Sequence, residues 1–255
     1  FGEAGGTVCS SVEEVLSDVD VVITMVPNGS VVNDIVTRYK RRFTPSTLFI
    51  DMSTTSPADA RAAAEQLAEV GVDFLDAPVS GGLAGESEGA LSIMVGGHES
   101  VLEKARGVLA LLGRSITYMG PVGSGQVTKA ANQLIVGGTL ALVAEATVLL
   151  KKSGVDPVTA LSALRGGLAG SRILDLKGPQ MIEREFTPTF AAGLHLKDMD
   201  IAMAVGHEAH CVLPVTACVL QLFEAVCACG FAEQDHSAII KIIETLSGIE
   251  VERRN

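Results

Sequence analysis

The sequence contains no tryptophan, and aromatic residues make up only 4% of its 255 positions. It has no run of basic residues, and its formal net charge is −11. Surfaces that bind nucleic acid need clustered cations and aromatic rings that stack on bases, and anionic membranes also attract clustered cations. The composition therefore argues against nucleic acid and membranes as partners.

Cysteine is scarce and unevenly placed, with Cys9 near the start of the chain and the other four close to its end. An odd number in this arrangement does not suit a disulfide framework, so we expect a reducing compartment and a cytoplasmic protein. Cys227 and Cys229 have no second pair at the spacing of a zinc site, and His207 and His210 do not complete an H-E-x-x-H motif. We therefore predict no metal site.

A third absence is the G-x-G-x-x-G turn that normally opens a dinucleotide-binding sheet. Gly120, Gly123 and Gly125 have a different spacing and follow the last predicted strand rather than the first. We interpret the chain, which begins at Phe1, as lacking a βαβ segment on the order of 30–40 residues. The choice between NAD and NADP stays open, because the residue that reads the ribose 2′ position lies in that segment.

Short apolar runs rich in Val, Ile and Leu are present, and they predict strands at residues 20–26, 47–51, 72–76, 91–95 and 115–119. Unbroken apolar runs are typical of parallel strands that helices cover on both faces. Predicted helices near residues 56–70 and 99–112 separate some of these strands. The first part of the chain therefore predicts a doubly wound α/β domain of Rossmann type.

After Gly125 the pattern is helical throughout. The first of the predicted helices is long, and the set covers approximately residues 125–152, 156–165, 171–182, 194–209, 215–229 and 237–246. We expect two domains, an incomplete nucleotide-binding domain at residues 1–121 and an all-helical domain at residues 122–255.

The longest apolar segment covers residues 134–150 and includes Gly137, Gly138 and Glu145. It is marginal as a bilayer span, and it is more typical of a helix that is buried all round, within a domain or between subunits. We therefore expect a homo-oligomer.

Residues 120–132 join the two predicted domains and carry candidate chemistry. Glycine lets a backbone approach a ligand closely, and the start of a helix offers unpaired N–H groups. Lys129 and Asn132 are three residues apart and share one helical face. An ammonium and an amide in this position can protonate and orient a carbonyl oxygen. The same residues also suit an ordinary turn followed by an exposed helix start.

Segments that follow the predicted strands, at residues 27–29, 52–55 and 77–82, are small and polar. Ligands of open α/β sheets bind outside the carboxyl ends of the strands. These segments are either loops that contact a cofactor or ordinary turns.

The residues Asp76-Ala-Pro-Val-Ser-Gly-Gly82, together with Gly123-x-Gly125-x-x-x-Lys129-x-x-Asn132, resemble the β-hydroxyacid dehydrogenase family, which includes 3-hydroxyisobutyrate dehydrogenase. The resemblance covers essentially the whole chain and includes residues 51–54, 94–97 and 196–198. It implies an NAD- or NADP-dependent oxidoreductase that acts on a small carboxylate-bearing aldehyde or its hydroxyacid.

Within the family, further stretches are most similar to members that reduce tartronate semialdehyde to D-glycerate; these are residues 165–171, 194–198 and 235–237 and the region around Val251. Specificity for 3-hydroxyisobutyrate, for succinic semialdehyde or for glyoxylate is the alternative. An alternative of another class is a non-catalytic, dehydrogenase-like oligomerisation module. The missing glycine-rich turn favours it, and the joint presence of Lys129, Asn132 and Ser80 opposes it.

The resemblance implies a role for each matching residue. Lys129 would donate the proton to the carbonyl oxygen, Asn132 would hold the substrate, and Phe190 would shape the site. The substrate carboxylate would bind to Ser80, Gly81 and Gly82, and the cofactor would contact Val26, Pro27, Thr54, Lys197 and Asp198. Asn132 also suits a satisfied buried amide, Phe190 a core residue, and the Lys197–Asp198 pair a charged surface.

Overall fold

The computed structural model describes residues 2–251, apart from the side chain of Ala84. The chain divides into two compact units, residues 1–129 and 130–255. The longest helix, α6 (Ser124–Lys152), begins in the first unit and continues into the second. The functional boundary that the sequence places between residues 121 and 122 stays a prediction.

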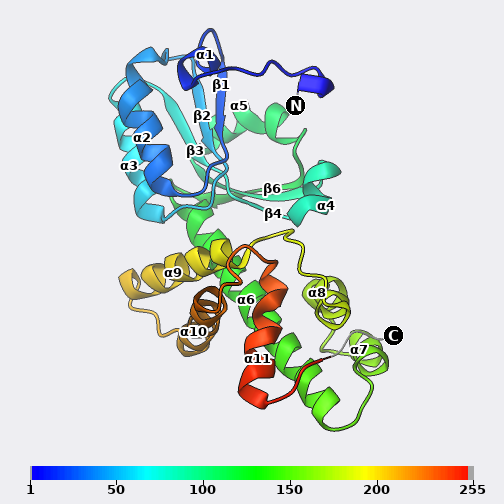
Figure 1. The fold of residues 1–255 in the computed structure, drawn as a ribbon. Helices are drawn as coiled ribbons and strands as arrows, with labels where there is room; N and C mark the ends of the chain where they lie inside the picture. The colour runs from blue at the N-terminus through cyan, green and yellow to red at the C-terminus, as the bar shows by residue number, and fades with distance from the viewer. Residues whose placement is uncertain (1, 252–255) are drawn as a thin grey trace. The chain divides into compact units, whose positions relative to one another are not determined.

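A six-stranded sheet forms the centre of the first unit (Figure 1). Its strands are β1 (Val21–Thr24), β2 (Leu48–Asp51), β3 (Asp73–Asp76), β4 (Val79–Ser80), β5 (Leu91–Gly97) and β6 (Gly113–Gly120). Their order is β1-β2-β3-β5-β4, and β6 also pairs with β5. All five predicted strands are present, and the two-residue strand β4 was not predicted.

The sheet is mixed and not parallel throughout. β1, β2 and β3 are parallel, as are β5 and β6, but β5 runs antiparallel to both β3 and β4. The link from β4 to β5 holds only the short helix α4 (Gly82–Ser87) and a turn, whereas a parallel crossover needs about a dozen residues or more. The apolar pattern could not reveal this, because it reports burial on both faces and not strand direction.

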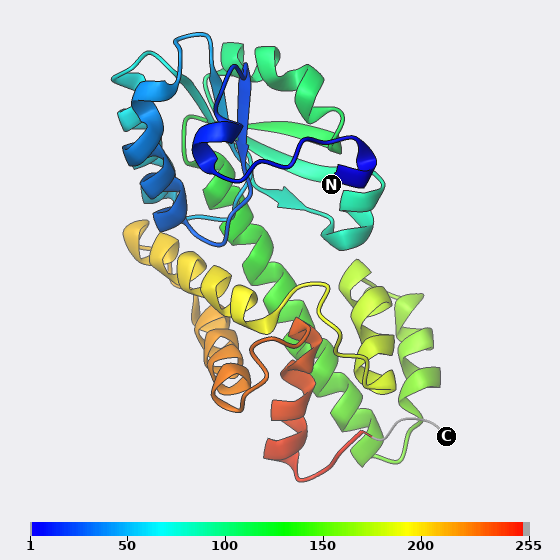
Figure 2. The same cartoon turned by 45° about the horizontal axis from the view of Figure 1, so that its top comes forward.

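Helices cover both faces of this sheet. α2 (Gly29–Tyr39) and α3 (Pro57–Ala68) lie side by side on one face, and α5 (Glu99–Leu109) packs on the other (Figures 1 and 2). Phe49 belongs to the cluster beneath α2 and α3, while its neighbours Leu48 and Ile50 belong to the cluster beneath α5. Successive residues of β2 thus enter opposite cores, which is why the strand is an unbroken apolar run.

Polar side chains cap both α2 and α3, but only the start of α3 could be predicted from the sequence. The predicted start of α3 is confirmed, because the Ser56 hydroxyl accepts from the Asp59 N–H and Pro57 is the first helical residue. α2 was not predicted, since Asn28 was assigned to a loop. Its side chain caps the helix by accepting from the Val31 N–H at 3.1 Å. The short helix α1 (Val12–Val15) was also missed.

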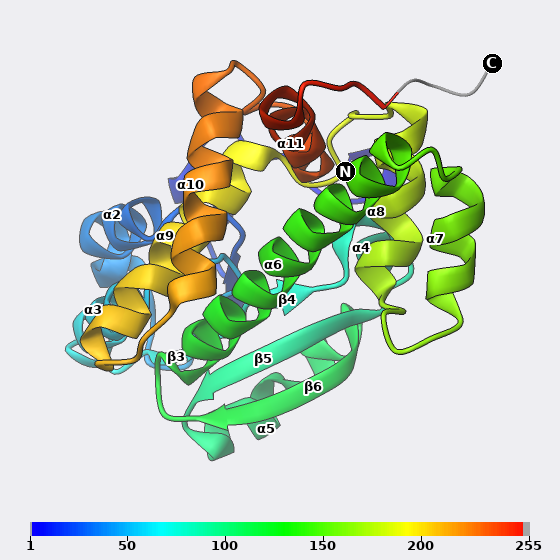
Figure 3. The same cartoon turned by 90° about the horizontal axis from the view of Figure 1, so that it is seen from below.

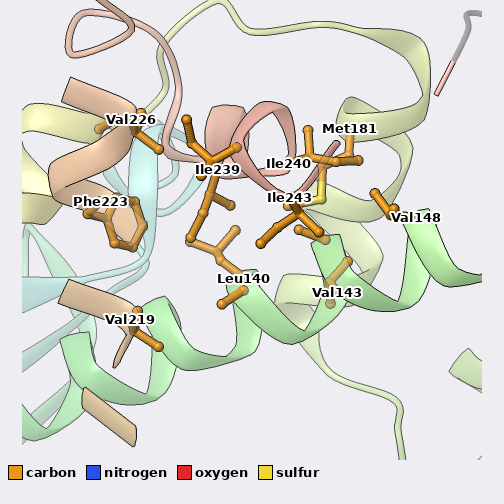
Figure 4. Packing of buried hydrophobic residues seen from close by; sticks show 14 of the residues in the cluster. Leu140, Val143, Val148, Met181, Val219, Phe223, Val226, Ile239, Ile240 and Ile243 are labelled. Carbon is orange, nitrogen blue, oxygen red and sulfur yellow. The ribbon is translucent and has the colours of Figure 1, made fainter. Parts of the chain in front are cut away.

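The second unit is helical, as predicted. Around α6 it contains α7 (Pro157–Arg165), α8 (Arg172–Glu183), α9 (Ala192–Glu208), α10 (Pro214–Ala228) and α11 (Ile239–Ser247). α7 and α8 flank one side of α6, and α9 to α11 flank the other (Figure 3). The core is mainly aliphatic and includes the aromatic Phe223; Leu140 and Val143 of α6 face Ile239, Ile240 and Ile243 of α11 (Figure 4).

The chain itself buries only part of the surface of α6. Ile135, Leu142 and Leu149 are 64%, 65% and 66% exposed, and their seven-residue spacing places them on one stripe. By length and composition alone α6 could cross a membrane, yet its opposite face forms the core of the second unit. Burial all round within the domain is therefore excluded for this helix, and its burial between subunits stays a prediction.

Candidate functional site

Lys129 is held against the strand that carries Ser80. Its side chain leaves the second turn of α6, and the residue is only 6% exposed. Its Nζ donates a 2.7 Å hydrogen bond to the main-chain oxygen of Val79, which precedes Ser80 in β4. The structure thus brings together two candidate features that lie far apart in the sequence, the ammonium group of Lys129 and the turn that begins at Ser80.

The turn after β4 has a backbone that only glycine adopts easily. Gly81 and Gly82 have φ angles of 152° and 63°, and both residues are exposed. Ser80 is half-buried and pairs with Ser92 of β5. One exposed turn therefore carries a hydroxyl and glycine backbone N–H groups, which suit a carboxylate.

Asp76 fixes the start of α6 from the end of β3. Its carboxylate accepts from the Gly123 N–H at 2.7 Å and from the Gln126 N–H at 3.0 Å. Burial raises the pKa of Asp76, and the hydrogen bonds from Gly123, Gln126 and Gly125 oppose that rise. A carboxylate in this position also complements the positive end of the helix dipole. The position of Lys129 therefore depends on Asp76.

Gly125 allows this close packing. A Cβ atom there would collide with the main-chain oxygens of Met94 and Asp76, and one on Gly96 would collide with the Asp76 carboxylate. Gly125 thus approaches the protein's own backbone, where the sequence suggested a ligand.

The loops after β1 and β2 lie against each other. The two strands pair in parallel with Thr24 opposite Asp51, so their carboxyl ends meet at one edge. The Val26 N–H donates to the Ser53 hydroxyl at 2.9 Å across the two loops. The structure therefore brings the predicted cofactor residues of the first unit into neighbouring segments; Val26 and Thr54 are half-buried and Pro27 is exposed.

Gln126 connects the second of these loops to α6. Its Oε1 accepts from the Thr55 N–H at 3.0 Å, and its Nε2 donates to the main-chain oxygen of Ser53 at 2.8 Å. Sequence reasoning selected neither Gln126 nor Asp76 as a site residue, although both lie within the quoted stretches. The sequence did contain one indication of a role for Gln126, because it is a long polar residue one turn before Lys129 in a segment of mostly small residues.

In the second unit a chain of side chains links three of the predicted residues. The Asn132 amide donates to Gln133 Oε1 at 2.7 Å, and Gln133 Nε2 donates to the buried Asp198 carboxylate at 2.7 Å. Lys197 Nζ lies 3.2 Å from the other oxygen of Asp198. Gln133 joins them and was missed, because it is adjacent to Asn132 and has no motif of its own.

Phe190 packs on buried imidazoles. Its ring centroid is 5.8 Å from that of His195 and 5.6 Å from that of His236. The loop that carries it is tied to Asp235, whose carboxylate accepts from the Thr189 N–H at 3.0 Å and pairs with Lys177 Nζ at 2.9 Å. A packing role for Phe190 is thus evident, and its role toward a substrate stays a prediction.

The His195–His236 contact joins the two Nδ1 atoms at 3.0 Å, so one ring must donate and the other accept. Burial lowers the pKa of His236 to about 4, although the Asp235 carboxylate opposes this. Burial alone would raise the pKa of Asp235, but the charges and hydrogen bonds around it, from His236, Lys177 and Thr189, hold it well below its usual range. At neutral pH His236 is therefore uncharged and Lys177 is the cation that partners Asp235.

Comparison with known proteins decides the family. Residues 1–120 match the model of the NAD-binding domain of 6-phosphogluconate dehydrogenase, and residues 123–243 match that of the NAD-binding region of NADP-dependent 3-hydroxyisobutyrate dehydrogenase. The chain is 39% identical to the 2-hydroxy-3-oxopropionate reductase of Escherichia coli, over 95% of this chain and 84% of that protein. The chain belongs to the 3-hydroxyisobutyrate dehydrogenase family.

Other members of the family resemble it at similar length. The 2-(hydroxymethyl)glutarate dehydrogenase of Eubacterium barkeri is 35% identical over 97% of this chain and 83% of that protein. The solved structure of Mycobacterium tuberculosis 3-hydroxyisobutyrate dehydrogenase with L-serine has a TM-score of 0.84 and 33% identity, covering 92% of this chain and 83% of that one. The predicted Rossmann-type domain and helical domain are thereby confirmed. As a member of this family the chain is an NAD(P)-dependent hydroxyacid oxidoreductase, and the non-catalytic alternative finds no support.

The residues present fit one end of an NAD(P) molecule. The adjoining loops after β1 and β2 offer a backbone with little side-chain bulk at the carboxyl edge of the sheet, where such cofactors bind. If the family assignment of these residues holds, Val26 and Pro27 would line the cofactor, and Thr54 would lie near the nicotinamide and its ribose. The 255 residues contain no G-x-G-x-x-G turn, so none of them is assigned to the pyrophosphate.

Proposed function

We propose that this chain catalyses the reversible NAD(P)H-dependent reduction of tartronate semialdehyde to D-glycerate. The observation that carries the proposal is the 2.7 Å hydrogen bond from Lys129 to Val79, which holds an ammonium beside the turn of Ser80, Gly81 and Gly82. The 39% identity to a 2-hydroxy-3-oxopropionate reductase supports this substrate, since that name denotes the same aldehyde.

The chemistry assigned to the residues is the following. When bound, a reduced nicotinamide would supply the hydride that the carbonyl carbon takes up, and it would itself be oxidised. Lys129 gives a proton from Nζ to the carbonyl oxygen as negative charge develops there, and it takes the proton back in the oxidation direction. The Ser80 hydroxyl and the N–H groups of Gly81 and Gly82 bind the substrate carboxylate, so no second full positive charge is needed near the reacting carbon.

The residues of the second unit receive supporting roles in this proposal. Asn132 donates a hydrogen bond to the substrate, and Phe190 limits its size. Lys197 and Asp198 contact the cofactor. The connection of Asn132 through Gln133 to the Lys197–Asp198 pair supports treating Asn132, Lys197 and Asp198 as one group.

Substrate choice is tested by kinetics. The expected result is the highest kcat/KM with tartronate semialdehyde, compared with the semialdehydes of 2-methylmalonate and succinate and with glyoxylate, using NADH and NADPH in parallel. A preference for one of the other aldehydes would replace the substrate and keep the reaction class. The absence of turnover with all of them, together with no nucleotide binding in calorimetry, would overturn the proposal.

We further propose a cytoplasmic homo-oligomer with functional domains at residues 1–121 and 122–255. The exposed stripe of Ile135, Leu142 and Leu149 supports association with another subunit. All five cysteines are free thiols, as a reducing compartment would keep them.

A further inference from the structure

The side chain of Gln126 holds the main chain on both sides of Thr54. Its planar amide accepts from the Thr55 N–H and donates to the Ser53 carbonyl, in the way that a neighbouring strand would pair with this segment. The residue is 1% exposed, so water does not compete for these bonds. Two hydrogen bonds therefore fix the backbone of Thr54.

The backbone of Gln126 is fixed as well. Its N–H donates to the Asp76 carboxylate at 3.0 Å, and Lys129 follows one turn later with its Nζ bonded to Val79. All of these contacts lie within the first unit. The side chain of Gln126 thus bonds the loop after β2 to the turn of α6 that precedes Lys129.

We propose that Gln126 is a positioning residue that sets Thr54 relative to Lys129. The inference rests on the proposed function, in which Thr54 lies at the nicotinamide and Lys129 supplies the proton. Hydride and proton must reach adjacent atoms of one carbonyl group, so a small displacement between the two residues lowers the rate of the chemical step.

The test substitutes Gln126→Met, which keeps the length of the side chain and removes both hydrogen bonds. Gln66→Met is the matched control. Gln66 also lies on a helix and also accepts a hydrogen bond, from the Thr37 hydroxyl at 2.9 Å, but it is half-buried whereas Gln126 is buried. Its bonds within residues 2–251 are to Thr37 and Asn33 and not to the segment of Thr54. Gln126→Met should lower kcat by about 10- to 100-fold and raise the nucleotide KM by about 3- to 10-fold. The aldehyde KM should stay within about 2-fold, and all constants of Gln66→Met within about 2-fold.

A double-mutant cycle separates positioning from general destabilisation. If Gln126 acts through Thr54, Gln126→Met should change the nucleotide KM little in a Thr54→Ala background. Additive effects of the two substitutions on the nucleotide KM would overturn the inference. Equal kinetic losses in Gln126→Met and Gln66→Met would overturn it as well.

Hydrogen exchange provides a measurement that needs no turnover. The Thr55 amide should exchange at least about 10-fold faster in Gln126→Met than in Gln66→Met, because only the former removes its acceptor. An unchanged Thr55 amide overturns the inference whatever the activity. A faster Thr55 amide in a chain that reduces none of the aldehydes and binds no nucleotide would instead overturn the proposed function, and with it the catalytic meaning of the bond.

Discussion

The hydrogen bond between Lys129 Nζ and the main-chain oxygen of Val79 ties the candidate proton donor to the candidate carboxylate site. Because Val79 and Ser80 form a strand of only two residues, this bond is also one of the contacts that hold the strand in place. Changes at Lys129 and at Ser80 should therefore not be independent.

Lys129→Met should lower kcat by about three to four orders of magnitude, because it removes the proposed proton donor while its length and apolar stem remain. Stability should fall by about 1–2 kcal/mol, since the Val79 oxygen loses its partner. Steady-state kinetics and thermal unfolding measure the two effects. Lys104→Met, which removes a surface lysine paired with Asp73, is the control and should be nearly silent. Near-normal turnover of Lys129→Met would contradict the assignment of Lys129 as the proton donor.

Ser80→Ala should raise the substrate KM by about 10-fold, equivalent to about 1.4 kcal/mol, because one donor to the carboxylate is lost. The kcat should change much less, since the serine does not contact the reacting carbonyl in the proposal. Initial rates across substrate concentrations measure both constants. An unchanged KM would contradict the carboxylate role.

Asp51→Asn should stabilise the protein at neutral and alkaline pH. Asp51 is fully buried, and its Oδ2 has no hydrogen-bond partner among residues 2–251. Burial raises its pKa, which the Ser53 and Thr24 bonds oppose and the Asp76 charge reinforces. A carboxyl whose pKa is raised on folding loses stability as pH rises through that pKa, and an amide does not. The gain in Tm should therefore be larger at pH 8 than at about pH 4, near the ordinary pKa of this carboxyl, and a lower Tm of the variant than of the parent at pH 8 would count against this account.

Acid should destabilise the second unit before the carboxylates titrate fully. The pKa of His236 falls from an ordinary 6.5 to about 4 on burial, so the unfolded chain binds a proton in this window that the folded chain does not. Stability should consequently fall as the pH drops from about 6.5 toward 4, by about 1–3 kcal/mol. Urea unfolding at several pH values measures the slope. His236→Gln should flatten it, and an equal slope in that variant would refute the assignment.

Leu142→Glu should dissociate the proposed oligomer, because it places a charge in the middle of the stripe formed with Ile135 and Leu149. Light scattering should give a lower mass for this variant at equal concentration. Leu111→Glu changes another exposed leucine, in the first unit, and should leave the mass unaltered. A monomeric mass for the parent chain would overturn the proposed oligomer.

Sequence reasoning succeeded where one physical cause dominates a segment. The strand at Leu48 to Asp51 could be predicted because each of its faces enters an apolar core. The antiparallel direction of β5 could not, since it follows from the length of a connection whose elements, β4 and α4, are too short to leave a pattern. α2 was missed because Asn28 and Gly29 suit a turn and a helix start equally.

Some residues of the candidate site could likewise be predicted from the sequence, and others could not. Lys129 and the Ser80 turn carry chemistry in their residue types, so they could be selected without coordinates. Gln126 and Gln133 are glutamines with no motif, and only their bonds to the Thr54 segment and to Asp198 give them significance. Such connections depend on tertiary distances that the spacing of residues along the chain does not encode.

The Asp76 carboxylate at the start of α6 has one more consequence. The N-terminus of a helix that begins with glycines often binds an anionic ligand, such as a phosphate or a substrate carboxylate. In this protein the carboxylate of Asp76 occupies that position, since the N–H groups of Gly123 and Gln126 already donate to it. The N–H groups at the start of α6 are thus not available to an anionic ligand. In the first unit such a ligand would instead bind to the Ser80 turn and the Lys129 ammonium.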